Sequence, residues 1–350
     1  FAVLKGLHMG LFALLAGLVL PHWWAIPAVA AIWTGLERTH GTFGFAWLAL
    51  GNAAADMEVL LRLAPLAGVY ALSFVLAMMN CALALALAGR PRRHLAWLLA
   101  LPLLFLLPPA PPAEPPDRLA ASVQPNVDGA LEWGPGDGSR FHDRLALLTL
   151  QAALLPRQPK PDLLLWPEMP APMYFDSDPN LQRVAAGAAR AAAAPLVSGA
   201  VSFNPRGAPL NSAVFLNERG EHTDRYDKIY LVPFGEFVPR PFSFVNRITK
   251  EAGDFAPGTR IVTFPVGEHR LGAFICYESV FPHLVRRFAA EGAEAFVNLS
   301  NDGYFGRSAA RACQARVSSG QGAGSRRAAG AAPRDRSGST CRSTPRPVPR

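Results

Sequence analysis

Cysteine is scarce in this sequence, and the few cysteines are far apart. The four are Cys81, Cys276, Cys313 and Cys341. Such scattered positions give neither a disulfide framework nor the ligand spacing of a metal site. We therefore expect no metal ion and no cofactor. Cys276 is the single thiol in the part of the chain that has a soluble composition, which is compatible with a nucleophile that must stay reduced.

Acidic residues are almost missing from the C-terminal end, and this absence accounts for the basic charge balance. Residues 307–350 contain ten arginines and one acid, Asp335. The rest of the chain contains 24 basic and 25 acidic residues, so the formal net charge of +8 belongs to its end. The charge therefore does not indicate a nucleic-acid-binding surface on the folded part.

Residues 312–350 also lack aromatic side chains and consist almost entirely of Arg, Ala, Gly, Ser and Pro. Such a segment cannot bury enough apolar surface to offset the entropy lost on ordering. We predict a disordered tail, and its composition is typical of out-of-frame translation of a GC-rich gene. The chain begins with Phe and lacks a signal peptide pattern, so we expect it to start inside a longer protein.

Charged residues make up only 17% of the chain and hydrophobic residues 50%, and the apolar excess lies near the N-terminus. The apolar stretches are 2–20, 22–36, 63–89 and 95–107. The third is the strongest candidate for a membrane span, because Leu66 to Ala88 contains no charge. The proline-rich residues 108–112 end the last stretch. We predict a transmembrane helical region over residues 1–112.

The orientation of this region follows from one basic loop. Arg90-Pro91-Arg92-Arg93-His94 separates the last two apolar stretches. Short loops rich in Lys and Arg stay in the cytoplasm. One further crossing then predicts that the chain after Pro112 lies on the periplasmic side of a bacterial inner membrane, to which a multi-pass protein would belong.

From Leu119 onward, short β-type stretches alternate with helical ones. Helices are predicted over 139–155 and 181–193, and strands over 120–123, 162–165, 196–203, 212–216, 223–226, 260–264, 271–276 and 295–299. Strands mixed with helices of this length are typical of an α/β layered domain. We predict that this domain covers residues 113–311.

Three apolar stretches carry a reactive polar residue at or near one end. Glu168 follows a buried-strand pattern, although a turn acid facing water would look the same. Lys228 precedes an apolar stretch that contains proline, and a surface lysine is its alternative. Cys276 ends a buried strand and leads into a helical pattern, and a structural buried cysteine is its alternative. A strand-to-helix turn would instead direct backbone N–H groups toward the thiol, which lowers its pKa and provides an oxyanion site.

A fourth polar residue has unusual neighbours. Glu236 lies between Gly235 and Phe237-Val238-Pro239, an unexpected setting for a solvated acid. A buried, paired carboxylate and an exposed one both stay open at this point.

In chain order, these residues resemble the catalytic Glu, Lys and Cys of the carbon–nitrogen hydrolase, or nitrilase, superfamily. The apolar N-terminal region narrows the resemblance to its membrane-bound branch, the apolipoprotein N-acyltransferases. It covers about residues 1–310. It rests on the following motifs in order: Val123-Gln124-Pro125-Asn126, Trp166-Pro167-Glu168, Asn211-Ser212-Ala213, Tyr226-Asp227-Lys228, Leu231 to Pro239, Cys276-Tyr277-Glu278 and Asn298 to Asp302.

The resemblance implies α-helical transmembrane segments followed by an α/β nitrilase-like domain, an αββα sandwich. It implies that Cys276 takes an acyl chain from a phospholipid as a thioester and passes it to the N-terminal amine of a diacylglyceryl-prolipoprotein. Glu168 would be the general base, and Lys228 would stabilise the thiolate and the oxyanion. The partners would be these two substrates and the bilayer, with no nucleic acid, and the protein would be a monomer.

The resemblance also implies supporting residues. The Tyr277 backbone N–H would help to bind the oxyanion, Glu236 would hold Lys228 in place, and Glu278 would line the site. Trp166 and Asn301 complete the supporting or substrate-binding set.

Three other functions remain possible on the sequence alone. A membrane-tethered amidase or nitrilase would share the three catalytic residues. An inactive remnant, a pseudoenzyme, would follow if the unusual C-terminal end replaces part of the catalytic domain. A transporter is disfavoured because the clearest span lacks the intramembrane charges that would line a path.

Overall fold

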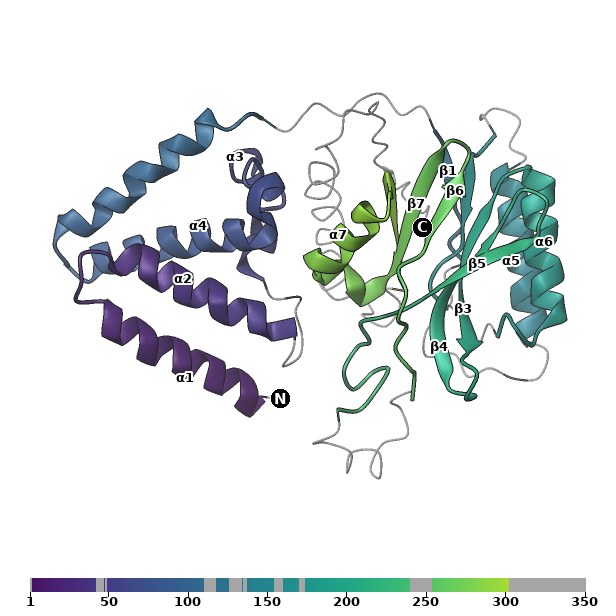
Figure 1. The fold of residues 1–350 in the computed structure, drawn as a ribbon, viewed down its shortest axis with the longest axis horizontal. Helices are drawn as coiled ribbons and strands as arrows, with labels where there is room; N and C mark the ends of the chain where they lie inside the picture. The colour runs from purple at the N-terminus through teal and green to yellow at the C-terminus, as the bar shows by residue number, and fades with distance from the viewer. Residues whose placement is uncertain are drawn as a thin grey trace, which may run out of the picture. The chain divides into compact units, whose positions relative to one another are not determined.

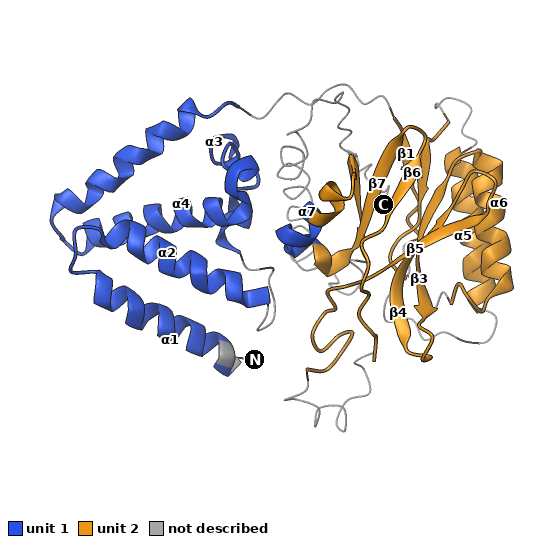
Figure 2. Cartoon of the chain, in the orientation of Figure 1, with its two compact units in different colours: residues 1–111, 279–286, 309–331 blue, residues 112–278, 287–308, 332–350 orange. Residues whose placement is uncertain are grey.

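The computed structural model describes residues 2–41, 47, 49–109, 118–125, 134, 137–153, 160–169, 174–239 and 254–301. Its chain divides into two compact units, which Figure 2 colours separately. Unit 1 comprises Phe1–Pro111, Ser279–Arg286 and Ala309–Ala331, and unit 2 comprises Pro112–Glu278, Arg287–Ser308 and Ala332–Arg350. The tail over 312–350 and the motif residues Asn126 and Asp302 lie outside the described residues. The domain boundaries at 112 and 311 and the disorder of the tail stay predictions.

Unit 1 is helical (Figure 1). Its main elements are α1 (Ala2–Val19), α2 (Ala25–Arg38), α3 (Glu58–Leu61), α4 (Ala64–Leu87) and the 3-10 helix η4 (Arg92–Leu106), with short 3-10 turns η1 (Thr39–Gly41) and η3 (Leu50–Ala54). Helix α2 packs its apolar face against α1 and α4, which are apolar on all sides. The buried residues between them include Ile26, Val29, Met78 and Ala82.

One described helix, α4, is long and apolar enough to cross a membrane by length and composition. The expected α-helical span over 95–107 is instead part of the 3-10 helix η4, which contains Pro102. Proline has no backbone N–H to donate to an α-helix and clashes with the preceding turn, which accounts for this departure. The other predicted spans stay predictions.

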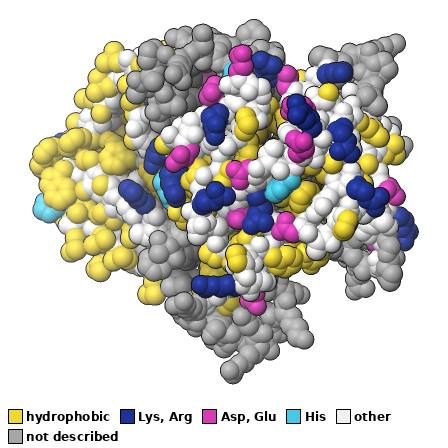
Figure 3. Space-filling model, turned by 45° about the vertical axis from the view of Figure 1, so that its right-hand side comes forward, with side chains coloured by type: hydrophobic (Ala, Val, Ile, Leu, Met, Phe, Trp, Pro, Cys, Tyr) yellow, Lys and Arg dark blue, Asp and Glu magenta, His cyan; other side chains and the backbone are white. Residues whose placement is uncertain are grey.

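Unit 1 exposes large apolar side chains in rows. On α1, Leu7, Leu14 and Leu18 are each more than 60% exposed, and on α4 Leu83 and Leu87 are 60% and 81% exposed. Figure 3 shows hydrophobic side chains gathered over the helical unit at the left of that view. An apolar surface of this extent marks a contact with a membrane or a partner in proteins generally.

Unit 2 contains two β-sheets. The first has the order β1-β2-β3-β4-β5, in which β1, β2 and β3 run parallel and β3, β4 and β5 are antiparallel neighbours. Its strands are β1 (Ala120–Ser122), β2 (Leu163–Leu165), β3 (Leu196–Phe203), β4 (Pro209–Leu216) and β5 (His222–Asp227). The second sheet consists of β6 (Thr263–Val266), β7 (His269–Ile275) and β8 (Ala295–Leu299), with β6 antiparallel and β8 parallel to β7.

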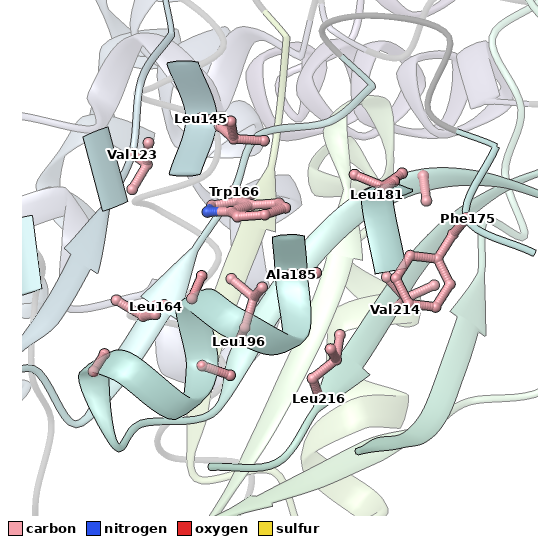
Figure 4. Packing of buried hydrophobic residues seen from close by; sticks show 14 of the residues in the cluster. Val123, Leu145, Leu164, Trp166, Phe175, Leu181, Ala185, Leu196, Val214 and Leu216 are labelled. Atoms are coloured by element: carbon pink, nitrogen blue, oxygen red, sulfur yellow. The ribbon is translucent and has the colours of Figure 1, made fainter. Parts of the chain in front are cut away.

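Helices α5 (Asp137–Ala153) and α6 (Pro179–Ala192) cover one face of the first sheet. Asp178 caps α6, since its side chain accepts hydrogen bonds from the backbone N–H groups of Asn180 and Leu181. The core of this layer joins α5 and α6 to β2, β3 and β4, as Figure 4 shows for Leu145, Trp166 and Leu196.

The other face of the first sheet meets the second sheet. Phe215 of β4 stacks on Phe264 of β6, which joins the two sheets across their interface. Beyond the second sheet, the Phe288 ring of α7 (Pro282–Ala290) lies over Gly272 and Phe274 of β7. The layers therefore follow the order helix, sheet, sheet, helix, and the predicted α/β fold is confirmed.

Every predicted strand has a counterpart in the structure, but β4 begins three residues before its predicted start, at Pro209, and β6 is displaced along the chain. Strands β3 and β8 have the predicted bounds, whereas the strand predicted over 260–264 lies over Thr263–Val266. A two-residue hairpin at Gly267, with φ of 59°, pairs Val266 with His269. Because this turn fixes where β6 ends, the strand lies closer to the turn than its apolar pattern suggested.

Gly199 of β3 supports the backbone that carries Glu168. A Cβ atom at Gly199 would lie 2.5 Å from the Pro167 carbonyl oxygen and 2.6 Å from Glu168 Cα. Gly199→Ala should therefore lower the free energy of unfolding by about 1–3 kcal/mol, the usual cost of overpacking. Thermal unfolding of the detergent-solubilised protein measures this.

Gly187→Ala in α6 is the matched control, since no atom lies within 4 Å of a Cβ there. It should raise the free energy of unfolding by about 0.5–1 kcal/mol, as for other helix-interior glycines. Equal melting temperatures for the two variants would contradict the close packing at Gly199.

Candidate active site

Glu168 lies just beyond the end of β2, and its carboxylate is buried. Oxygen Oε1 accepts a hydrogen bond from Asn211 Nδ2 at 3.0 Å and contacts Lys228 Nζ at 3.3 Å. Oxygen Oε2 accepts one from the backbone N–H of Asn301 at 3.0 Å. Neutral donors thus hold this carboxylate at both oxygens, with a cation alongside.

Lys228 follows β5 directly and is 1% exposed. Its backbone N–H donates to the Asn211 carbonyl at 2.8 Å, which continues the β4–β5 pairing by one residue. The ammonium group lies 3.3 Å from Glu168 and 2.9 Å from Glu236. Burial alone would lower the pKa of Lys228, but the nearby carboxylates of Glu168 and Glu236 outweigh it and hold the pKa above its usual range.

Glu236 is held in a tight loop after β5. Its Oε1 accepts from Asn211 Nδ2 at 2.6 Å, and its Oε2 accepts from the backbone N–H of Val232 at 2.7 Å. The loop closes through a bridge between Pro233 and Phe237. Of the two settings left open for Glu236, the structure has the paired, largely buried one.

Cys276 ends β7 and begins the 3-10 helix η6 (Cys276–Val280) with φ of 48°. This left-handed conformation is costly for a residue with a Cβ and forms a sharp strand-to-helix turn. Asn298 Nδ2 donates to the Cys276 carbonyl at 3.4 Å. Burial and the nearby charge of Glu168 raise the pKa of the thiol, while Lys228 and a hydrogen bond with Ser300 act in the opposite direction.

Glu278 is fully buried and joins the two segments that carry Cys276 and Lys228. Its Oε2 accepts from the Ile275 N–H at 2.9 Å. Its Oε1 accepts from Tyr226 Oη and the Ile229 N–H, each at 2.7 Å, and from the Tyr230 N–H at 3.1 Å. Burial raises the pKa of Glu278 to about 7, against the effect of these donors and of Lys228.

The remaining predicted supporting residues differ in position. Asn301 contacts the cluster through its backbone N–H, and its side chain donates to the Met169 carbonyl at 3.3 Å. Tyr277 is a buried side chain at the Cys276 turn. Trp166 lies in the hydrophobic core, where its Nε1 donates to Thr149 Oγ1 of α5 at 2.9 Å (Figure 4). The structure therefore places the Trp166 side chain in the packing between α5 and the first sheet, and its supporting or substrate-binding role stays a prediction.

Sequence reasoning did not include Asn211 among the site residues. Its Nδ2 contacts both Glu168 and Glu236. The only sequence signal was the motif Asn211-Ser212-Ala213, because an asparagine inside a strand carries no chemistry until its neighbours are known. Among the described residues, no group of three or more His, Cys, Asp or Glu side chains could hold a metal ion.

The cluster has the parts needed for nucleophilic catalysis. It places a thiol, a carboxylate that can accept its proton and a buried cation that can stabilise negative charge in one desolvated place. The elements that carry them come from separate parts of the sequence: β2, β5 and β7. Chemistry of this type begins with attack of a thiolate on a carbonyl carbon.

Comparison with known proteins identifies the family. Residues 119–320, more than half of the chain, match the carbon–nitrogen hydrolase family. The chain therefore belongs to the carbon–nitrogen hydrolase family. Residues 1–82 match the apolipoprotein N-acyltransferase N-terminal domain.

Several relatives of this chain are named apolipoprotein N-acyltransferase. The protein of Geobacter metallireducens is 34% identical over 302 residues, covering 80% of this chain and 57% of the relative. That of Pseudomonas syringae is 30% identical over 344 residues, covering 88% and 65%. That of Azotobacter vinelandii is 34% identical over 304 residues, covering 80% and 56%. This chain thus spans between half and two thirds of the length of these relatives.

Solved structures give weaker likenesses. A carbon–nitrogen hydrolase from Helicobacter pylori has a TM-score of 0.42 and 19% identity, covering 59% of this chain and 69% of its own. Nit3 of Saccharomyces cerevisiae, a member of branch 10 of the nitrilase superfamily, has a TM-score of 0.40 and 21% identity, covering 52% and 63%.

Proposed function

We propose that this chain transfers an acyl group from a phospholipid to the N-terminal amine of a diacylglyceryl-prolipoprotein, as an apolipoprotein N-acyltransferase. The observation that carries the proposal is the buried cluster of Glu168, Lys228 and Glu236 beside Cys276. The match of residues 1–82 to the N-terminal domain of such enzymes, and the names of the relatives, support this substrate class over a soluble amide.

In the first half-reaction, Glu168 takes the proton of the Cys276 thiol as sulfur attacks the ester carbonyl carbon of the phospholipid. The carbonyl oxygen becomes an oxyanion, which Lys228 and the Tyr277 backbone N–H stabilise. The carbon–oxygen ester bond then breaks, and Glu168 returns the proton to the departing glycerol oxygen. A thioester on Cys276 and a lysophospholipid remain.

In the second half-reaction, the amine of the lipoprotein attacks the thioester carbon. Glu168 accepts a proton from the amine, the carbon–sulfur bond breaks, and the proton passes to Cys276 sulfur. The products are an amide and the free thiol, so the cycle closes without an external reagent. Two such steps through a covalent intermediate give ping-pong kinetics.

The charges of the site favour a coupled proton transfer. The ionised Glu168 raises the pKa of the Cys276 thiol, and this cause is removed once Glu168 is protonated. Moving the proton from sulfur to Glu168 leaves the total charge unchanged, which matters because separated charges are costly in a buried site. Glu236 stays paired with Lys228 throughout, because its carboxylate lies nearer to the ammonium than that of Glu168 does.

The membrane setting is part of the proposal. Both substrates carry acyl chains and stay in the bilayer, so the enzyme must reach them there. The exposed leucines of unit 1 and the apolar helix α4 support insertion into a membrane. The proposal further takes the protein as a multi-pass monomer of the inner membrane, with the catalytic domain on the periplasmic side as the basic loop predicts.

Mass spectrometry of the protein incubated with phospholipid alone tests the chemistry. Cys276 should accumulate an acyl adduct that hydroxylamine removes. Cys276→Ala should lose the adduct completely, and Glu168→Gln should slow its formation by about 10²–10⁴-fold, the usual loss for a general base. Lys228→Ala should be comparably slow, since one oxyanion donor is worth about 3–4 kcal/mol.

Cys81→Ala is the control, because that thiol lies in α4. It should form the adduct at the wild-type rate. An adduct on Cys81, or acyl transfer by Cys276→Ala, would refute the nucleophile. No adduct on the wild-type chain would favour the inactive remnant, and an adduct only with soluble amides would favour the tethered amidase.

Reporter fusions test the orientation. A reporter that is active only in the periplasm should be active when fused after Pro112 and inactive when fused at Arg92, because the basic loop stays in the cytoplasm. The reverse pattern would put the cluster in the cytosol and exclude the lipoprotein substrate.

A further inference from the structure

Asn211 occupies a central place in the cluster. It lies in β4, opposite Lys228 in the extended β4–β5 pairing. Its Nδ2 is 3.0 Å from Oε1 of Glu168 and 2.6 Å from Oε1 of Glu236. The ammonium of Lys228 contacts the same two oxygens. Two acceptors are thus bridged by two donors, of which one is charged and one is neutral.

The orientation of the Asn211 amide is fixed by charge. Its Oδ1 is buried and has no hydrogen-bond partner among the described residues. Leaving a buried acceptor unsatisfied costs stability, so the amide would turn if turning satisfied it. Turning would direct Oδ1 at two carboxylate oxygens and remove both donated hydrogen bonds. The contacts to Glu168 and Glu236 therefore outweigh the unsatisfied oxygen.

A neutral donor has a particular advantage here. A second cation in this position would bind Glu168 strongly and make it a poorer base. With no donor there, two carboxylates would share one ammonium, and like charges so close favour protonation of one of them. The amide donates two hydrogen bonds without adding charge.

We propose that Asn211 is a positioning residue that keeps Glu168 ionised and free to accept the Cys276 proton. This inference rests on the proposed function only in taking Glu168 as the base for Cys276. It concerns an earlier event than acyl transfer, so it can be tested without a lipid substrate.

The test is the rate at which iodoacetamide alkylates Cys276, measured against pH on the full chain by peptide mass spectrometry. Alkylation requires the thiolate. In the proposed site the thiol passes its proton to Glu168, so the thiolate forms only when Glu168 is ionised and can accept that proton. Losing a donor favours the protonated carboxylate, so the acidic limb of the profile should move to higher pH. Asn211→Asp adds a third carboxylate. In this variant the pH at which alkylation becomes half-maximal should rise by at least about one unit, so that alkylation at a fixed acidic pH is about tenfold slower than in the wild type.

Asn211→Ala carries the test if Asn211→Asp does not fold, and its limb should move in the same direction by less. Asn204→Asp is the matched control. Asn204 Oδ1 accepts from the backbone N–H groups of Arg206 and Ala208, and an aspartate keeps both contacts. Its profile should match the wild type.

A purely structural role for Asn211 would lower the rate by one factor at every pH and leave the limb in place, and that result would overturn the inference. Acyl-adduct formation, measured in parallel, separates the two claims. A displaced limb without any acyl adduct on the wild type would support the inference and contradict the proposed function. An acyl adduct on the wild type, together with an Asn211→Asp pH profile that does not move, would support the proposed function and contradict the inference.

Discussion

The buried ammonium of Lys228 is the feature on which the rest of the site depends. A cation that is 1% exposed is stable only when its desolvation is offset by close negative charge. Glu168 and Glu236 provide that charge from the end of β2 and from the loop after β5. Glu236 follows Lys228 by 8 residues, whereas Glu168 precedes it by 60 residues. The pairing with Glu168 therefore constrains how the ends of β2 and β5 fit together.

Glu278 extends the same constraint to the nucleophile. It follows Cys276 by two residues and accepts hydrogen bonds from Ile229 and Tyr230, the two residues after Lys228. Any displacement of the Lys228 segment is thus transmitted to the Cys276 turn. The strained φ of Cys276 can persist because this buried network over-determines its surroundings. The geometry of the site is consequently set by a buried network that joins the ends of β5 and β7.

The sequence predicted the strands and the reactive residues at their ends, because hydrophobic runs and strand-terminal polar residues are local patterns. It could not predict that Asn211 contacts both carboxylates, since that depends on the β4–β5 register. The same limit applies to Trp166, whose neighbours in the Trp166-Pro167-Glu168 motif suggested the site, whereas its side chain packs on α5. The predicted end of β6 was wrong because the hairpin turn after Val266 determines where the strand ends, and the apolar pattern does not. Local sequence patterns therefore predict the strands and helices, whereas the pairing of strands determines which side chains contact one another in the site.

A double-mutant cycle on Lys228 and Glu236 tests most directly whether the buried charge holds the site together. Lys228→Met should lower the free energy of unfolding by about 3–5 kcal/mol, because it leaves two carboxylates buried without a cation. Adding Glu236→Gln should recover part of this loss, with a coupling energy of at least about 1–3 kcal/mol. Effects of the two substitutions that add within about 0.5 kcal/mol would contradict the account, because residues that do not interact are additive to that degree.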